Sequence, residues 1–253
     1  MTEINKALFE YCLRLGDSSL ILGHRLSEWC GHGPVLEEDI ALINISLDHI
    51  GRSINILNYA GQVEGKNRTE DDLAYHRNER DFRNLLITEH PNKDFAFTIA
   101  RQFFFDTYSF FLYEELKNSK DATIAAIAEK ALKEITYHLR HSSEWMLRLG
   151  DGTLESKEKV QTAVNELWRF TGELFLMDQV DEILIKEGIA IDLNLVKSKW
   201  ENKISEILEK ATLDKPIETH IHSGSQKGVH TEHLGFLLAE MQYLPRTYPK
   251  AKW

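Results

Sequence analysis

The 253-residue chain carries 40 acidic and 30 basic residues, and its formal charge of -10 has the wrong sign for a nucleic-acid groove. A hydrophobic share of 42% is ample for a packed core, whereas 14 glycines and 5 prolines are too few for a turn-rich all-β fold. No apolar run approaches the roughly 20 residues that span a bilayer, so we expect no membrane segment. Cys12 and Cys30 form no CxxC pair, and the N-terminus lacks the layout of a secretion signal, so we expect a cytoplasmic protein.

Helical periodicity dominates the first part of the chain. Residues 4–30 predict a first helical region that is interrupted near Gly16. Pro34 indicates the start of a second helix, which we expect to end at Gly61 and Gly65. Apolar residues at four-three spacing predict that one face of this second helix forms a continuous seam inside a bundle: Leu36, Ile40, Ile43, Leu47, Ile50, Ile54 and Leu57.

A polar connection at residues 66–93, with a short helix near 80–89, separates this pair of helices from the rest. Asp94 is the expected N-cap of a third helix over 94–117. The next helices are predicted from Asp121 to Gly150, at 156–187, at 192–211, and from Thr231 to a stop at Pro245.

The absence of strand alternation makes the chain all-α. A connection as long as 66–93 lets the third helix cross the bundle, as in crossover four-helix topologies. We therefore expect a single ferritin-like domain over residues 1–253, which is a four-helix bundle with additional C-terminal helices.

Asp106 stands out within the third helix, because it interrupts an aromatic run. It shares one helical face with Ile99, Phe103, Phe110 and Tyr113, so its carboxylate is expected in an apolar interior. A carboxylate there must be paired, hydrogen-bonded, protonated or metal-bound, because its burial otherwise costs several kcal/mol.

Inward-facing acids on four long helices are typical of a ferritin-like metal centre, with one Glu on each of two helices and a Glu-x-x-His pair on each of the others. In this chain Glu134 is followed three residues later by Tyr137, and Asp48 is followed by Gly51. Tyr137 and Gly51 therefore stand at the two positions where the pattern has histidine, although His138 comes directly after Tyr137. The degenerate di-iron positions are Glu28, Asp48, Asp106, Glu134 and His138.

Two interpretations of these positions differ in what they imply. In the first, which we favour, they are residual polar positions that are tied together by buried hydrogen bonds and ion pairs. The cationic partners considered for Asp106 are Arg25, Arg52, Arg101 and His138. In the second they still bind two metals, but each missing imidazole removes a ligand from a site.

A second group of polar residues lies near the C-terminus, and it contains His220, His222, His230 and His233. No Cys or inward carboxylate is spaced to complete a zinc site there, so a metal is not the preferred interpretation. A contact surface is more attractive, because the segment is irregular and precedes an amphipathic helix. The partner-binding candidates are Lys227, His230 and His233.

Several stretches match one family in order along essentially the whole chain. They are RLSEWCGH at 25–32, NISLDHIG at 44–51, ALKEITYHLR at 131–140, LWRFT at 167–171, KGVHTEHLG at 227–235 and AEMQYL at 239–244. Together they resemble the C subunit of the bacterial phenylacetyl-CoA epoxidase.

The resemblance implies a structural subunit of a multicomponent monooxygenase of aerobic phenylacetate breakdown. In that family the catalytic A subunit holds a di-iron centre and uses O₂, with electrons that a reductase draws from NADPH, to epoxidise the aromatic ring of phenylacetyl-CoA. The C subunit pairs with A and is not catalytic on its own. We therefore expect no cofactor and no catalytic residue in this chain. The expected partners are the A subunit, small accessory subunits and the reductase, and a homodimer stays open.

Two other functions stay as alternatives. An autonomous ferritin-like di-metal oxidase would use the five degenerate positions, Glu28, Asp48, Asp106, Glu134 and His138. An iron-storage or generic scaffold protein is disfavoured by the family-like stretches.

Overall fold

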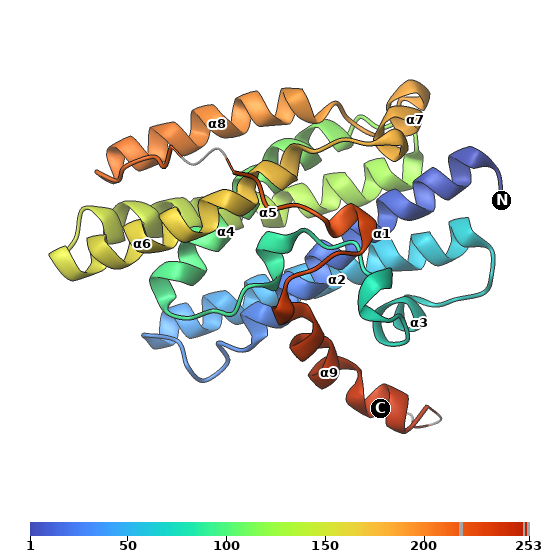
Figure 1. The fold of residues 1–253 in the computed structure, drawn as a ribbon, viewed down its shortest axis with the longest axis horizontal. Helices are drawn as coiled ribbons and strands as arrows, with labels where there is room; N and C mark the ends of the chain where they lie inside the picture. The colour runs from blue at the N-terminus through green and yellow to red at the C-terminus, as the bar shows by residue number, and fades with distance from the viewer. Residues whose placement is uncertain (218–219, 250, 252–253) are drawn as a thin grey trace. The chain divides into compact units, whose positions relative to one another are not determined.

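The computed structural model describes residues 1–217, 220–249 and 251. Within these ranges the chain forms helices and turns but no strand, which confirms the all-α prediction and is consistent with a ferritin-like bundle (Figure 1). None of the described helices is both long and apolar enough to cross a membrane. The α-helices are α1 (Glu3–Ser27), α2 (Leu36–Glu64), α3 (Glu70–Tyr75), α4 (Phe95–Leu116), α5 (Ala122–Gly150), α6 (Leu154–Thr171), α7 (Gln179–Glu187), α8 (Leu193–Lys210) and α9 (Glu232–Thr247).

The chain divides into two compact units. Unit 1 comprises Met1–His32, Asp39–Pro91 and Gly224–Trp253, and unit 2 comprises Gly33–Glu38 and Asn92–Ser223. Unit 1 thus holds α1, most of α2, α3 and α9, whereas unit 2 holds α4 to α8. That residues 1–253 act as one domain stays a prediction.

Helix α1 is continuous, so the predicted interruption near Gly16 is wrong. A Cβ atom at Gly16 would lie 2.7 Å from Cδ2 of Leu57 on α2, so the glycine allows two helices to approach closely. About two turns further on, the carbonyl of Gly23 accepts a hydrogen bond of 2.7 Å from the Ser46 hydroxyl of α2. Gly16 therefore serves packing between helices instead of ending one.

Asp17 is fully buried beside this contact and is paired with Arg77. The Arg77 guanidinium donates to both carboxylate oxygens, and the backbone N–H of Arg83 donates to one of them at 2.9 Å. The guanidinium carbon also lies 4.3 Å from the ring centroid of Phe82. The connection after α2 is thereby fastened to the middle of α1.

The apolar seam predicted for α2 lies largely on its exposed side, which corrects the sequence interpretation. The exposed fractions of Leu36, Ile40, Leu47 and Ile54 are 73%, 51%, 62% and 47%. Only Leu57 of that seam is fully buried. The buried side instead mixes apolar and polar residues: Leu42, Ile45, Ser46, His49, Arg52, Ser53, Ile56, Leu57 and Ala60. Apolar spacing alone therefore selected the wrong face.

Helix α2 also passes through Gly61, where it was expected to end. A Cβ atom at Gly61 would lie 2.1 Å from the carbonyl oxygen of Arg68, so only glycine permits this close return of the chain. The helix ends at Glu64, and Gly65 follows with a φ of +71°. Of the two glycines, only Gly65 marks the end.

The connection at 66–93 contains α3 and two short 3-10 helices, η1 (Glu79–Asp81) and η2 (Leu86–Glu89), in place of one helix over 80–89. Helix α9 packs against this connection: the Gln242 amide donates to the carbonyl oxygens of Ala74 and Arg77 at 3.1 and 3.0 Å. The helix continues to Thr247, so the predicted stop at Pro245 is wrong by a few residues. A proline in the last turn removes only one N–H near a helix end.

In unit 2, α4 is the central helix. It packs against α5, α6 and α8, and α5 in turn contacts α6 and α8 (Figure 1). Trp200 of α8 donates its indole N–H to the carbonyl oxygen of Phe104 at 2.9 Å, and Trp168 of α6 lies 5.8 Å from both aromatic rings. The predicted N-caps are confirmed: Asp94 accepts from the Phe97 N–H at 2.8 Å, and Asp121 caps α5.

The helix predicted over 156–187 is in fact three elements. Helix α6 ends at Thr171, η3 (Gly172–Phe175) follows, and α7 begins at Gln179. A Cβ atom at Gly172 would lie 2.6 Å from the side chain of Ile221, so the chain is crowded where the helix changes. The turn buries Leu174 and Phe175.

Candidate functional site

Asp106 lies in the middle of α4 and is 2% exposed, as predicted from its helical face. Every side chain from Ala96 to Ser109 is buried, and α4 packs against α5, α6 and α8 of its own unit. A carboxylate in this position needs a polar neighbour, since its charge has been removed from water.

His138 of α5 is such a neighbour, and its side chain is fully buried. A carboxylate oxygen of Asp106 and a ring nitrogen of His138 lie within 4.8 Å of one another. The buried side of α5 carries Ile124, Ala128, Ala131, Ile135, His138, Ser142 and Met146, so His138 is on the stripe that packs toward α4. Of the four cationic partners considered for Asp106, the structure thus brings His138 close within the same unit.

On α5, the positions expected for the Glu-x-x-His pair, Glu134 and Tyr137, each precede a buried residue by one position. Glu134 is half-buried and Tyr137 is 43% exposed, whereas Ile135 and His138 face the interior. The same shift occurs on α2, where Asp48 and Gly51 are only half-buried while His49 and Arg52 are buried. The placement of Glu134 and Asp48 in an inward set of polar residues stays a prediction.

Glu28 also departs from an inward ligand position. It is the C-cap residue of α1, its side chain is 43% exposed, and its carboxylate accepts from the Arg25 guanidinium at 2.7 Å. Arg25 in addition donates to the backbone carbonyl oxygens of Glu89 and His233 at 2.9 and 3.3 Å. Glu28 thus belongs to an arginine network at the end of α1.

These residues do not fit a pair of metal ions. In unit 2, the described residues of α4 and α5 bring together one carboxylate and one imidazole, Asp106 and His138. In unit 1, the buried side of α2 carries the imidazole of His49 and the guanidinium of Arg52, a cation that cannot act as a ligand. A di-metal centre of this architecture needs four carboxylates and two imidazoles from its helices. We assign no metal-dependent step to these residues.

The C-terminal histidines have different environments. The side chain of His230 is fully buried, with Nδ1 at 2.6 Å from Glu89 Oε1 and Nε2 at 3.0 Å from the Phe82 carbonyl oxygen. Its sequence-based role as a partner contact is therefore corrected, because no surface of the ring is available. His233 is half-buried and packs edge-on against His90, with ring centroids 5.5 Å apart, whereas Lys227 is exposed.

Glu89 is the buried centre of this C-terminal attachment, and sequence reasoning did not single it out. It is 0% exposed and accepts from the Asn84 amide at 2.9 Å, and from the N–H and hydroxyl of Thr231 at 2.7 and 2.6 Å. The signal in the sequence was weak, since a Glu within a polar connection is ordinarily solvent-exposed.

Burial by itself would lower the pKa of His230, but hydrogen bonding to the Glu89 carboxylate and its charge outweigh that effect and raise the pKa above its ordinary value. Both ring nitrogens face acceptors, so the ring satisfies both contacts only as a double donor, which is the protonated form. The cluster attaches the segment before the last helix through a charged hydrogen-bonded pair.

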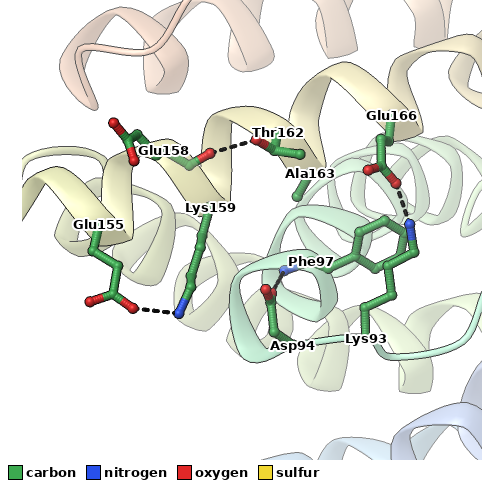
Figure 2. Close-up of a pocket in the computed structure, with 9 residues that line it drawn as sticks. All are labelled: Lys93, Asp94, Phe97, Glu155, Glu158, Lys159, Thr162, Ala163 and Glu166. Carbon is green, nitrogen blue, oxygen red and sulfur yellow. Dashed lines mark hydrogen bonds and ion pairs between the residues drawn. The ribbon is translucent and has the colours of Figure 1, made fainter.

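The surface clefts offer little chemistry. The cleft in Figure 2 has a volume of about 260 Å³ and lies between α6 and the start of α4. Most of its charged groups are already engaged: Lys93 pairs with Glu166, Lys159 donates to Glu155 at 2.6 Å, and Asp94 caps α4. The paired lysines and glutamates form a solvated rim and no convergent site.

Comparison with known proteins decides the family. The model of the phenylacetic acid catabolic protein family matches residues 1–253. The chain belongs to this family. It is similar to the C subunit of the 1,2-phenylacetyl-CoA epoxidase of Escherichia coli (strain K12), with 50% identity over 246 residues. The match covers 97% of this chain and 99% of the relative. The family expected from the stretches at 25–32 and 131–140 is thus confirmed.

Proposed function

We propose that this chain is the structural, non-catalytic C subunit of a multicomponent phenylacetyl-CoA epoxidase and that it stabilises the catalytic A subunit. The observation that carries the proposal is the full-length similarity to a protein named as the C subunit of that epoxidase. A subunit of a multicomponent enzyme has partner subunits. In this proposal the catalytic A subunit is the partner of this chain. The assembled enzyme would act on phenylacetyl-CoA in the cytoplasm during phenylacetate catabolism.

The residues of the bundle support the non-catalytic part of this proposal. Within unit 2, Asp106 and His138 supply one carboxylate and one imidazole, while Glu28 is exposed and Asp48 and Glu134 are half-buried. The di-iron centre, O₂ and the electrons from NADPH then belong to other subunits of the assembled complex. In this proposal the chain itself carries no cofactor.

The test is reconstitution. The chain and the A subunit from the same organism are expressed separately and together. The co-expressed proteins are purified through a tag on the A subunit. We expect the two to co-elute as a stable complex, and we expect iron to follow the A subunit when the metal is measured in each separated chain. Epoxidation of phenylacetyl-CoA should require the A subunit and the reductase.

The alternative, an autonomous di-metal oxidase, predicts the opposite distribution. About two irons per chain in this protein after iron-replete expression, together with O₂ consumption in the absence of the A subunit, would establish the alternative and remove our proposal. Failure of the two chains to co-elute would remove the structural role.

A further inference from the structure

Residues 224–231 lead into α9, and we call them the latch segment. Their sequence, GSQKGVHT, contains one apolar side chain, Val229, which is 58% exposed. Helix α9 differs from this segment, because it buries Leu234, Leu237 and Leu238. Burial of apolar surface therefore holds the helix in place but contributes little to holding the latch segment.

The latch segment meets the connection after α2 by backbone contact. A Cβ atom at Gly228, where φ is +67°, would lie 2.1 Å from the carbonyl oxygen of Arg80 and 3.2 Å from a guanidinium nitrogen of Arg83. The glycine thus allows the two backbones to touch. Because Gly228 places no side chain into the core, the segment can leave Arg80 without repacking at this point.

The attachment of the latch segment rests on His230 and Thr231. The ring of His230 lies 2.6 Å from Oε1 of Glu89 through Nδ1 and 3.0 Å from the Phe82 carbonyl oxygen through Nε2. Thr231 donates its N–H and its hydroxyl to the other carboxylate oxygen, at 2.7 and 2.6 Å. The side chains of His230 and Glu89 are both fully buried. A neutral imidazole has one N–H, so loss of a proton sets a lone pair against an acceptor and removes the positive partner of a buried carboxylate.

The charged groups around His230 come from the connection and from α1. Burial lowers the pKa of His230, but the hydrogen bond and the charge of Glu89, with a contribution from Glu79, raise it above its ordinary value. Arg83 lies beside the segment, and Arg25 of α1 donates to the backbone carbonyl of Glu89 at 2.9 Å. Both arginines keep their charge near neutral pH, whereas an imidazole changes its charge there.

Two further imidazoles lie close by and titrate in the same range of pH. The rings of His90 and His233 pack edge-on against each other, with centroids 5.5 Å apart. The backbone carbonyl of His233 accepts from Arg25 at 3.3 Å. His233 therefore provides a control for His230, because it is a histidine of the same part of the chain that does not contact the Glu89 carboxylate through the bonds described above.

The second half of α9 is held by groups that do not titrate near neutral pH. The amide of Gln242 donates to the carbonyl oxygens of Ala74 and Arg77 at 3.1 and 3.0 Å. The guanidinium of Arg246 donates to the carbonyl oxygen of Tyr75 at 3.1 Å. An amide does not ionise and a guanidinium stays charged, so these bonds persist when an imidazole loses its proton.

We propose that the latch segment opens and closes with the protonation of His230, while α9 stays attached. With the ring protonated, residues 224–231 are closed on Glu89; loss of the proton opens them and uncovers the Glu89 carboxylate and the Phe82 carbonyl. The attachment is complete at low pH and is lost as the pH rises, because the closed state holds the extra proton. The inference concerns an equilibrium within this chain and does not depend on the proposed function.

The test is hydrogen exchange of the full-length chain, measured by mass spectrometry on peptides that cover 225–231 and 237–244. Each rate is divided by the intrinsic rate at the same pH, so that the quotient reports local opening. Between the ordinary pKa of about 6.5 and the folded pKa, the opening constant of the latch segment should rise by up to about tenfold per pH unit. The opening constant of 237–244 should stay constant.

Two variants assign the titrating group. His230→Gln keeps an N–H donor but has no titratable ring, so the opening constant of the latch segment should be raised at low pH and should no longer depend on pH. The matched control is His233→Gln, which removes an imidazole three positions away. In the control the rise with pH should persist.

Each other outcome overturns the inference. An opening constant of 225–231 that does not change with pH removes the latch, and an equal rise in both peptides means that α9 detaches as well. A rise that survives in His230→Gln, or that disappears in His233→Gln, assigns the proton to another group. If His230→Gln does not fold, the contrast between the two peptides of the unaltered chain decides alone. None of these outcomes affects the proposed function, which co-elution with the A subunit tests.

Discussion

His230 and Glu89 form a buried ion pair, with 2.6 Å between Nδ1 and Oε1, and neither side chain is exposed. The pair joins residues that are 141 positions apart in sequence and ties the segment before α9 to the connection that follows α2. It also makes the attachment of the last helix depend on a proton, because His230 must donate from both nitrogens.

The first prediction concerns pH. Because the pKa of His230 is raised in the folded chain, its contribution to stability is complete below the ordinary value of about 6.5 and is lost as the pH rises through the folded pKa. The groups facing it are Glu89, Glu79 and the Phe82 carbonyl, all of which favour the protonated ring. The free energy of unfolding should therefore fall as the pH is raised over that window. In His230→Gln this part of the pH dependence should disappear. If the free energy of unfolding changed with pH equally in both proteins, the proposed role of the His230–Glu89 pair would be refuted.

The second prediction concerns the buried ion pair of Asp17 and Arg77. Asp17→Ala leaves the guanidinium buried without its carboxylate, so the free energy of unfolding should fall by about 3–5 kcal/mol in a denaturant titration. Replacing both residues with apolar ones of similar volume should cost much less, because no uncompensated charge is left. A double replacement as harmful as the single one would show that the pair is not the reason for the loss.

The third prediction concerns Asp106. Asp106→Asn keeps the shape but removes the buried charge beside His138, so the free energy of unfolding should change by less than about 2 kcal/mol in either direction. Turnover of the assembled epoxidase should stay within twofold, as it should for Glu134→Gln at a half-buried position. Size-exclusion chromatography first verifies assembly. A large loss of turnover in the intact complex would mean that Asp106 takes part in chemistry.

The fourth prediction uses two glycines of the same helix pair. Gly51→Ala should stabilise the free chain by about 0.5–1 kcal/mol, because alanine is the better helix former and its methyl group meets open space. Gly16→Ala should instead destabilise the chain by about 1–3 kcal/mol, since its methyl group would press into Leu57. Thermal unfolding of both variants measures the two signs. A loss of stability in Gly51→Ala would show that the helix is not open at that point.

The sequence predicted the helices themselves well, because the signals are local. Asp94 and Asp121 cap helices as their side-chain chemistry requires, and α5 ends at Gly150. The burial of Asp106 followed from its place on an aromatic face. The family-like stretches also identified the family, which the full-length comparison confirms.

Local signals failed where a neighbour far along the chain decides the outcome. A glycine such as Gly16 favours the interruption of a helix. Here the contact with Leu57 and the pairing of Asp17 with Arg77 keep that turn packed within α1. Pro245 likewise does not stop α9, which Gln242 holds against the connection.

Only the tertiary structure decided which side of each helix is buried. Spacing gives the angles between side chains of one helix, but it does not say which side meets the rest of the molecule. On α2 the apolar line of Ile40, Leu47 and Ile54 is exposed, while His49 and Arg52 are buried. On α5 the buried residue is His138 and not Glu134, because packing against α4 sets the rotation of the helix. A shift of one residue turns a side chain by about 100°, which separates an interior ligand from a surface group.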